Sequence, residues 1–262
     1  MLLINKNAII YGAGGSVGKA VARAFAKEGA KVFLAGRTIE KLKQTYEEII
    51  QNGGYAELYK VDALNQKQVE HNMKSIIECH KHIDISFNLI GMNDIQGLLL
   101  VDSTIEQFQS PIYTAVKTQF ITATVAAKSM IETGSGVILM LSANAAKKPF
   151  ENIGGFGVAC AAIEALTRQL AVELGKHNIR VNCLRSAGSP DAEGVAEVFD
   201  IHAKNLNMSK KEFEFQFSEK TMLKHLPTLN EVANVASIMA SDKAASITAA
   251  IINVTCGELA DK

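Results

Sequence analysis

The sequence predicts an α/β fold, built as a doubly wound parallel sheet in one three-layer α/β/α domain spanning residues 1–262. Short apolar runs bounded by Gly, Asn or Asp alternate with segments of helical periodicity along most of the chain. Buried strands of this kind between amphipathic helices are typical of a parallel sheet covered on both faces. No linker, repeat or low-complexity segment divides the chain, so we expect a single domain.

The first half of the chain supplies four expected strands and three expected helices, in alternation. The strands are expected at residues 8–11, 31–35, 56–61 and 83–90, and the helices at residues 16–28, 38–50 and 65–79. Apolar side chains recur on one face of the first helix, and Gly29 follows it as a helix stop. The pair Gly53–Gly54 ends the second helix in the same way.

The second half continues the alternation with one interruption. We expect helices at residues 103–108, 112–131, 155–175 and 228–241, and strands at residues 136–141, 180–184 and 250–254. Thr228 and Glu231 form a capping box that opens the last helix. Residues 191–225 are polar and helical, with a second capping box at Ser209, and form an insertion near the carboxyl ends of the strands. This insertion is either a lid or a surface helical pair.

Composition excludes several classes of function. The chain has 27 Lys plus Arg and 27 Asp plus Glu, so no net field attracts nucleic acid or an acidic membrane surface. No apolar stretch approaches the roughly 20 residues that span a bilayer, and the opening residues are a poor signal peptide. The six His residues show no metal-ligand spacing. The four cysteines are scattered, which predicts a reduced, cytoplasmic setting: Cys79, Cys160, Cys183 and Cys256.

A glycine-rich turn joins the first strand to the first helix. Its backbone can turn tightly beside a pyrophosphate, and the helix amino end supplies free N–H groups. The Ser16 hydroxyl either bonds a phosphate or crowds it, and a purely structural turn is the alternative for the whole loop. The candidate nucleotide-binding residues of this loop are Gly12, Gly14, Gly15, Ser16, Val17 and Gly18.

Arg37 follows the second strand, about 20 residues beyond the glycine turn. An acidic residue at this place would grip the ribose 2′-hydroxyl of NAD, and none is present. The Arg37 guanidinium can instead fork onto a 2′-phosphate, which favours NADP over NAD. A solvated surface arginine is the alternative.

These motifs, taken in order, resemble those of the short-chain dehydrogenase/reductase (SDR) family along the whole chain. Residues 11–18 are similar to the family's Thr-Gly-x-x-x-Gly-x-Gly loop, and Arg180-Val181-Asn182 matches its Arg-Val-Asn. The family's Pro-Gly is replaced by Ser186-Ala187. The resemblance implies a Rossmann-like fold and adds four cofactor-binding residues to the candidates above: Asp62 and Ala63 near adenine, Asn88 near the end of the expected fourth strand, and Gly91 just after it.

The same resemblance implies that the catalytic positions are degenerate. The family uses an Asn–Ser–Tyr–Lys tetrad, and the matching positions here hold Ala115, Ala143, Phe156 and Cys160. In the family the Tyr transfers a proton to the carbonyl oxygen, the Lys stabilises its phenolate, and the Ser bonds the developing oxyanion. Phe has no proton to give, Ala has no hydroxyl and Cys has no fixed positive charge. Such a site should lose most of its catalytic acceleration.

Substitute groups are few. Ser142 is expected to point away from the site along its strand. Cys160 is a nucleophile only if its pKa is lowered, and a buried Cys is usually inert. Lys147 and Lys148 could swing inward, but we expect them to lie on a solvated loop. Tyr113 is offset on its helix and is expected to point elsewhere.

Three functions remain open. The first is an NADP(H)-binding pseudo-enzyme or very weak reductase. The second is an active NADP-dependent oxidoreductase with a substitute proton donor. The third is a scaffold or partner subunit that binds no nucleotide. The resemblance also implies a homo-oligomer, a dimer or tetramer, formed through the helices at residues 112–131 and 155–175. Alanines of these helices would permit close approach or would pack against the sheet: Ala123, Ala126, Ala127, Ala159, Ala161 and Ala162.

Overall fold

The computed structural model describes residues 1–260 and confirms the doubly wound parallel sheet. The described residues form seven strands, and every adjacent pair is parallel, in the order β3-β2-β1-β4-β5-β6-β7. Their bounds are β1 (Asn7–Tyr11), β2 (Lys31–Gly36), β3 (Tyr55–Lys60), β4 (Ile85–Asn88), β5 (Gly136–Ala143), β6 (Ile179–Ser186) and β7 (Ile251–Val254).

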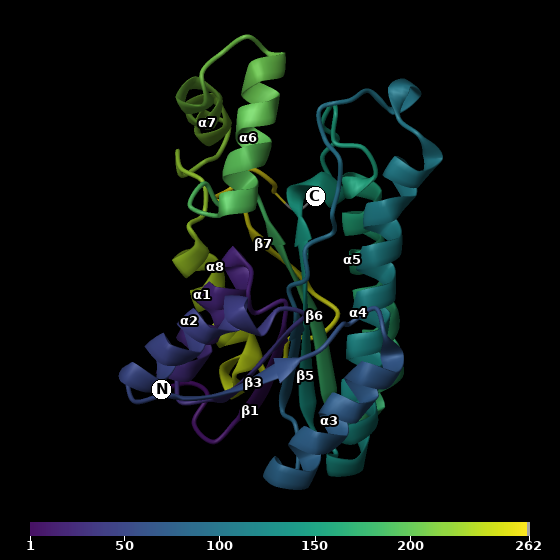
Figure 1. The fold of residues 1–262 in the computed structure, drawn as a ribbon, viewed down its shortest axis with the longest axis vertical. Helices are drawn as coiled ribbons and strands as arrows, with labels where there is room; N and C mark the ends of the chain where they lie inside the picture. Colours follow the sequence, from purple (N-terminus) through teal and green to yellow (C-terminus); the bar gives the residue numbers. More distant parts are fainter. Residues whose placement is uncertain (261–262) are drawn as a thin grey trace.

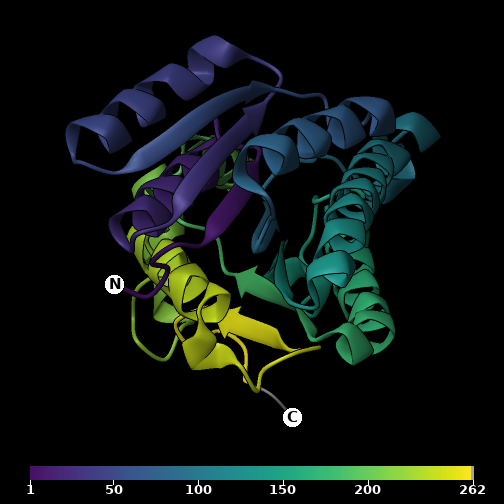
Figure 2. The ribbon, with the colours of Figure 1, turned by 90° about the horizontal axis from the view of Figure 1, so that it is seen from below.

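Helices cover both faces of this sheet (Figure 1). One face carries α1 (Ser16–Lys27), α2 (Ile39–Gln51) and α8 (Leu229–Ala240). The other face carries α3 (Gln66–His80), α4 (Ile105–Thr133) and α5 (Phe156–Leu174). Figure 2, seen from below, shows the sheet between these two layers. Short 3₁₀ turns occur at η1 (Leu100–Asp102), η2 (Asn144–Ala146), η3 (Gly175–His177) and η4 (Asp242–Ala244).

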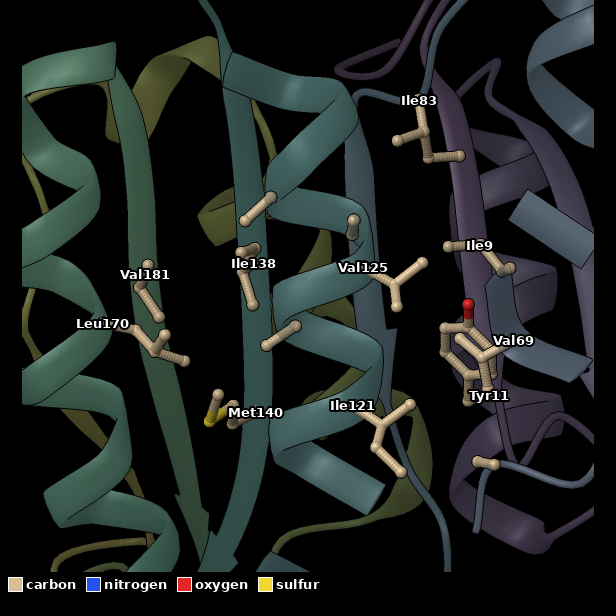
Figure 3. Close-up of a cluster of buried hydrophobic side chains, with 14 of the residues drawn as sticks. Ile9, Tyr11, Val69, Ile83, Ile121, Val125, Ile138, Met140, Leu170 and Val181 are labelled. Carbon is tan, nitrogen blue, oxygen red and sulfur yellow. The ribbon is translucent and has the colours of Figure 1, made fainter. Parts of the chain in front are cut away.

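The two layers enclose two hydrophobic cores, one on each face of the sheet. Successive residues of a strand point to opposite faces, so Ile9 and Tyr11 enter the core beneath α3–α5, while Ala8 and Ile10 enter the other. In Figure 3 the Tyr11 phenol oxygen points back along β1 toward Ile9. This buried hydroxyl has no hydrogen-bond partner among the described residues. The side chain of Tyr11 therefore fills the core and does not reach out toward the glycine turn.

The strand order reverses at β1, which pairs with β2 on one side and β4 on the other. In an open α/β sheet, ligands bind beyond the carboxyl ends of the strands at such a switch point. Tyr11 ends β1 and leads into the glycine turn, and Asn88 ends β4 beside it. The fold thus places the predicted nucleotide loop at the expected binding edge.

One predicted boundary is wrong. We expected separate helices at residues 103–108 and 112–131, but α4 is a single helix with Pro111 inside it. The sequence suggested a break there, whereas tertiary packing stabilises the continuous helix. Pro111 is buried against the start of α5, where an added Cβ on Gly155 would lie 3.1 Å from its ring. The same Cβ would lie only 2.0 Å from the Phe108 carbonyl oxygen, so a glycine is needed for this close approach.

The insertion at residues 191–225 consists of α6 (Glu193–Asn205) and α7 (Lys210–Glu219), which rise above the end of the sheet (Figure 1). The capping boxes at Ser209 and Thr228 are both present. Phe199, Phe213 and Phe217 pack together between the two helices. Phe217 also stacks on Phe150 of the loop after β5, with ring centroids 5.7 Å apart. The α6–α7 pair is therefore anchored to the body of the domain through aromatic contacts.

Candidate functional site

Two hollows lie beyond the carboxyl ends of the strands. The smaller pocket, of about 70 Å³, opens beside the ends of β1, β2 and β3. The larger cleft, of about 980 Å³, runs from the glycine turn past the ends of β5 and β6 to the α6–α7 pair. Gly91 lines both hollows, so they adjoin at the segment that follows β4.

The glycine turn is tightly packed against its neighbours. Gly12 has a positive φ of 77°, and an added Cβ would lie 2.5 Å from the Leu89 carbonyl oxygen. A Cβ on Gly18 would lie 2.2 Å from the Gly12 carbonyl oxygen, so helix α1 presses directly on the turn. No side chain caps the amino end of α1. The N–H groups of its first turn are therefore open to a ligand.

Most of the predicted cofactor residues line these hollows. The small pocket brings together Gly12, Arg37, Asp62, Ala63 and Gly91. The large cleft brings together Gly14, Gly15, Ser16 and Val17.

Two of the predicted cofactor residues, Gly18 and Asn88, line neither hollow. Gly18 acts through its packing on the turn. The buried Asn88 amide donates to Thr122 Oγ1 at 3.0 Å, and its Oδ1 accepts from the Ile90 N–H at 3.0 Å. Asn88 thereby fixes the backbone that leaves β4.

Arg37 and Asp62 differ in how they are held. Arg37 is exposed at the mouth of the small pocket, and no hydrogen bond or ion pair holds it within residues 1–260. The Asp62 carboxylate accepts from the Leu64 N–H at 3.1 Å, which orders the turn after β3. The pocket thus offers an ordered carboxylate and an unengaged guanidinium.

Ser16 is already engaged by the protein. Its hydroxyl oxygen accepts a 3.3 Å hydrogen bond from the backbone N–H of Glu193, the first residue of α6. The contact ties the glycine turn to the α6–α7 pair across the cleft.

The wall of the cleft is apolar where the sequence predicts the reaction centre. Ala143 at the end of β5 and Phe156 at the start of α5 both line it. Cys160, one helical turn beyond Phe156, is fully buried, and burial raises the pKa of its thiol to about 12. Ala115 is also buried, inside α4. Among these four positions none presents an acid, a base or a hydroxyl to the cleft.

Polar groups beneath this wall bond to one another. Glu164, one turn after Cys160, makes a two-pronged ion pair with Arg185, at 2.7 and 2.6 Å. The Ser142 hydroxyl donates to the same carboxylate at 2.8 Å, so Ser142 points away from the cleft as predicted. Glu164 and Arg185 are both buried. None of these three side chains lines the cleft.

The expectation that Lys147 and Lys148 are both solvated is wrong for Lys148. Lys147 is exposed, but Lys148 lines the cleft and its Nζ lies 2.7 Å from Glu258 Oε1. The Asn144 amide donates to the other oxygen of the same carboxylate. The Glu258 side chain is fully buried, and its negative charge draws the ammonium group into the wall. Because Glu258 comes from the segment after β7, 110 residues away, local sequence gave no signal of it.

Sequence reasoning also missed a chain of three polar side chains. Asp94 and Gln96, after β4, and His202, in α6, all line the cleft and are hydrogen-bonded in series. Asp94 and Gln96 lie in an irregular segment, and His202 has no metal-ligand spacing to the other histidines. Only the fold brings them within reach of one another.

The alanines of α4 and α5 serve internal packing more than an outer surface. Of the six alanines predicted to allow close helix approach, four are buried within the chain: Ala123, Ala126, Ala127 and Ala159. Ala161 is exposed and Ala162 is half-buried. Apolar side chains do lie on the outer faces of these helices, including Tyr113, Phe120 and Val172. The Tyr113 hydroxyl accepts from Lys117 of the same helix at 2.8 Å and is turned away from the cleft, as predicted.

No helix among the described residues is long and apolar enough to cross a membrane. All four cysteines are unpaired in the structure. Two of them, Cys160 and Cys183, are buried, and burial raises both thiol pKa values to about 12.

Known proteins match the chain over nearly its full length. The family described as enoyl-(acyl carrier protein) reductase matches residues 12–258. An uncharacterized oxidoreductase of Thermotoga maritima is 30% identical, over 97% of this chain and 98% of its own length. The uncharacterized oxidoreductase YxbG of Bacillus subtilis is 29% identical, over 98% of this chain and 92% of its own length. The 3-oxoacyl-[acyl-carrier-protein] reductase FabG of Chlamydia pneumoniae is 27% identical, over 97% of each chain.

Solved structures share the fold. The structure of an NAD⁺-bound xylitol dehydrogenase superposes with a TM-score of 0.92 at 23% identity, covering 97% of this chain and 99% of the other. A short-chain type dehydrogenase/reductase from Mycobacterium marinum has a TM-score of 0.84 at 26% identity, covering 99% and 97%. The structure of a protein from Beutenbergia cavernae, described as an NAD(P)-dependent gluconate 5-dehydrogenase with NADP bound at low occupancy, has a TM-score of 0.86 at 21% identity, covering 99% of each chain.

Proposed function

Since the chain belongs to the short-chain dehydrogenase/reductase family of oxidoreductases, we propose that it binds NADP(H) across the small pocket and the large cleft and acts as a pseudo-enzyme or very weak reductase. The glycine turn and the open amino end of α1 would receive the pyrophosphate. Asp62 and Ala63 would border adenine in the small pocket. Two solved structures of the same fold contain NAD⁺ or NADP, which supports nucleotide binding by this chain.

The residues at the end of β2 favour NADP over NAD as the cofactor. Arg37 stands there, exposed and unengaged within the described residues, and none of residues 36–38 carries a carboxylate that could grip a ribose 2′-hydroxyl. A guanidinium presents several N–H donors in a planar fork, which suits a phosphate. We assign Arg37 to the 2′-phosphate of NADP(H).

The apolar wall at Ala143 and Phe156 is the observation that supports loss of catalysis. A bound nicotinamide supplies a hydride, and the protein must supply the proton and stabilise the oxyanion. The positions that perform these tasks in the family here carry a methyl group, a phenyl ring and a buried thiol with a raised pKa. A positioned acid or base is worth typically ~10²–10⁴-fold in rate, so turnover should fall by at least that factor.

An active oxidoreductase with a substitute donor is the second candidate. Lys148 favours it, because its ammonium lies in the wall of the same cleft as Phe156. Its pairing with the buried Glu258 opposes it, since the ammonium group is already engaged by a carboxylate oxygen at 2.7 Å. A scaffold that binds no nucleotide is the third candidate. It is favoured by the Ser16 hydroxyl, which is already hydrogen-bonded to α6 and so is engaged by the protein.

Calorimetry and steady-state assays separate these three. We expect the protein to bind NADPH more tightly than NADH and to oxidise it negligibly with a wide panel of aldehydes and ketones. Ordinary enzymatic turnover with any carbonyl would overturn the pseudo-enzyme and support a substitute donor. If millimolar nucleotide produces neither a heat of binding nor a thermal shift, the scaffold that binds no nucleotide is the remaining candidate.

We also assign the protein to the cytoplasm and to a homo-oligomer, a dimer or tetramer. The exposed Tyr113, Phe120 and Val172 on α4 and α5 support an interface there. Sedimentation velocity should show a species of two or four chains, and replacing Phe120 with Lys should shift it toward the monomer. A monomer at all concentrations would contradict the assignment.

A further inference from the structure

The cleft contains a polar chain that the proposed nucleotide function does not use. Gln96 Nε2 donates to Asp94 Oδ2 at 2.5 Å, and Gln96 Oε1 lies 2.8 Å from His202 Nε2. Asp94 and Gln96 belong to the segment after β4, and His202 belongs to α6, so the chain bridges the two sides of the cleft.

The direction of these hydrogen bonds determines which ring nitrogen of the His202 imidazole carries the hydrogen. An ionised carboxylate only accepts hydrogen bonds, so the amide nitrogen of Gln96 must face Asp94. The amide oxygen then faces His202, and because this oxygen only accepts, His202 Nε2 must carry the hydrogen. In neutral His202 the other ring nitrogen, Nδ1, is left with a lone pair.

Burial lowers the pKa of the His202 imidazole, which favours this neutral form. Nδ1 has no hydrogen-bond partner within residues 1–260 and is not among the buried unpaired atoms, so it is accessible. His202 lines the cleft. His202 Nδ1 is therefore a hydrogen-bond acceptor at the cleft surface, and the neighbouring Gln96 fixes its tautomer.

The surroundings of this acceptor are aromatic. The His202 ring lies nearly parallel to that of Phe213, at 6.0 Å between centroids and 12° between planes. Phe199 and Phe217 pack against Phe213, and all three phenyl rings line the same cleft. A ligand that covers this wall must be largely apolar. A planar aromatic ring makes the most favourable contact with these phenyl rings.

From this geometry we propose that the α6 side of the cleft binds an aromatic compound carrying a hydroxyl group, which donates to His202 Nδ1 while its ring packs on the phenylalanine wall. Asp94 and Gln96 are positioning residues, because they act only through the tautomer of His202. The inference goes beyond the proposed function, since these side chains bind the ligand whether or not nucleotide is present.

Two matched probes test the assignment on the protein without nucleotide. 2-Naphthol and 2-methoxynaphthalene share the ring system, but only the first has a hydroxyl to donate. The chain contains no Trp, so the fluorescence of either probe can be titrated against a low protein background. We expect 2-naphthol to bind roughly fivefold more tightly, the effect of one neutral hydrogen bond. Equal affinities, or no binding of either probe, would overturn the proposal.

His202→Phe keeps a ring against Phe213 and removes the acceptor. We expect this variant to lose the preference for 2-naphthol while its affinity for 2-methoxynaphthalene stays the same. His71→Phe, at an exposed position on α3, is the matched control and should keep the preference. A preference that survives in His202→Phe contradicts the role of Nδ1.

A measurement on the unaltered protein guards against a misfolded variant. Long-range ¹H–¹⁵N spectra of the histidine side chains report which ring nitrogen is protonated. We expect His202 to be protonated at Nε2, with an Nδ1 signal that moves on addition of 2-naphthol and not of 2-methoxynaphthalene. The opposite tautomer, or an Nδ1 signal indifferent to both probes, would overturn the proposal. A separate calorimetric titration with NADPH measures nucleotide binding. Failure of the proposed function can therefore be distinguished from failure of this inference.

Discussion

The two ends of the crevice beyond the strands differ in what they offer a ligand. At the β1–β3 end, Arg37 and Asp62 present a guanidinium and a carboxylate to the small pocket, and the glycine turn presents N–H groups to the adjoining end of the large cleft. At the β5–β6 end, Ala143 and Phe156 present only apolar surface. Under the function we propose, one end of the crevice binds the nucleotide while the other end lacks groups for proton transfer. The difference arises because function resides in side chains placed on the fold.

The charged groups near β5 and β6 show the same difference. Glu164 and Arg185 lie close to the apolar wall but bond to each other beneath it, and Lys148 is paired with Glu258. At the other end, Arg37 is unengaged within the described residues. A charge that is already paired and buried contributes to packing, whereas an open charge can meet a ligand.

The largest expected effect comes from introducing the family's catalytic residues at the apolar end of the crevice. The triple variant Ala143→Ser, Phe156→Tyr, Cys160→Lys should increase NADPH-dependent carbonyl reduction by roughly 10² or more, because it returns a proton donor, its cation and an oxyanion donor. Stopped-flow or steady-state absorbance of NADPH measures the rate. Ala143→Ser alone is the control and should change little. A folded, NADPH-binding triple variant that is no faster would show that these positions do not face the nicotinamide.

Breaking the buried ion pair tests whether its charges support structure. Arg185→Met leaves the Glu164 carboxylate buried without its cation and should lower the free energy of unfolding by about 3–5 kcal/mol. Urea unfolding followed by circular dichroism measures it. The double variant Glu164→Leu, Arg185→Met should recover most of the loss, since no unpaired charge remains.

The exposed pair Lys74–Glu78 on α3 supplies the control for that experiment. Lys74→Met should change stability by less than about 0.5 kcal/mol, because solvent screens a surface ion pair. A similarly small effect of Arg185→Met would contradict the structural role of the buried pair.

At the polar end, Arg37→Ser should weaken NADPH binding about tenfold and leave NADH binding unchanged, because only NADPH carries the 2′-phosphate that a guanidinium can fork onto. Calorimetry with both nucleotides measures the two affinities. Arg168→Ser, at an exposed position on α5, should alter neither. Equal losses for both nucleotides would place Arg37 elsewhere than on the phosphate.

The smallest effect concerns Tyr11, which lies under the polar end and contributes no polar contact. Its hydroxyl is buried without a partner within residues 1–260, which costs free energy in the folded state. Tyr11→Phe should therefore leave stability unchanged or raise it, by up to about 1 kcal/mol, with NADPH affinity unaltered. A thermal melt checks the first outcome. A clear loss of stability would reveal a hydrogen bond to Tyr11 in solution.

Local signals in the sequence predicted most of the elements and the nucleotide edge. Periodicity located the strands and helices to within a few residues, and the capping boxes at Ser209 and Thr228 are formed as predicted. The prediction failed at α4, where buried packing against Gly155 overrides the expected break near Pro111. It failed again at Lys148, whose partner is remote in sequence.

The amino-acid sequence by itself determined the alternation of strands and helices, the glycine turn and the residue types at the apolar wall. These depend on spacing and on side-chain chemistry, which are readable along the chain. The tertiary structure alone decided that Ser16 bonds α6, that Glu258 holds Lys148, and that Asp94, Gln96 and His202 form one chain. Each of these contacts joins residues that only the winding of the sheet brings together, and a hydrogen bond requires atoms within about 3 Å, a condition that local sequence does not encode.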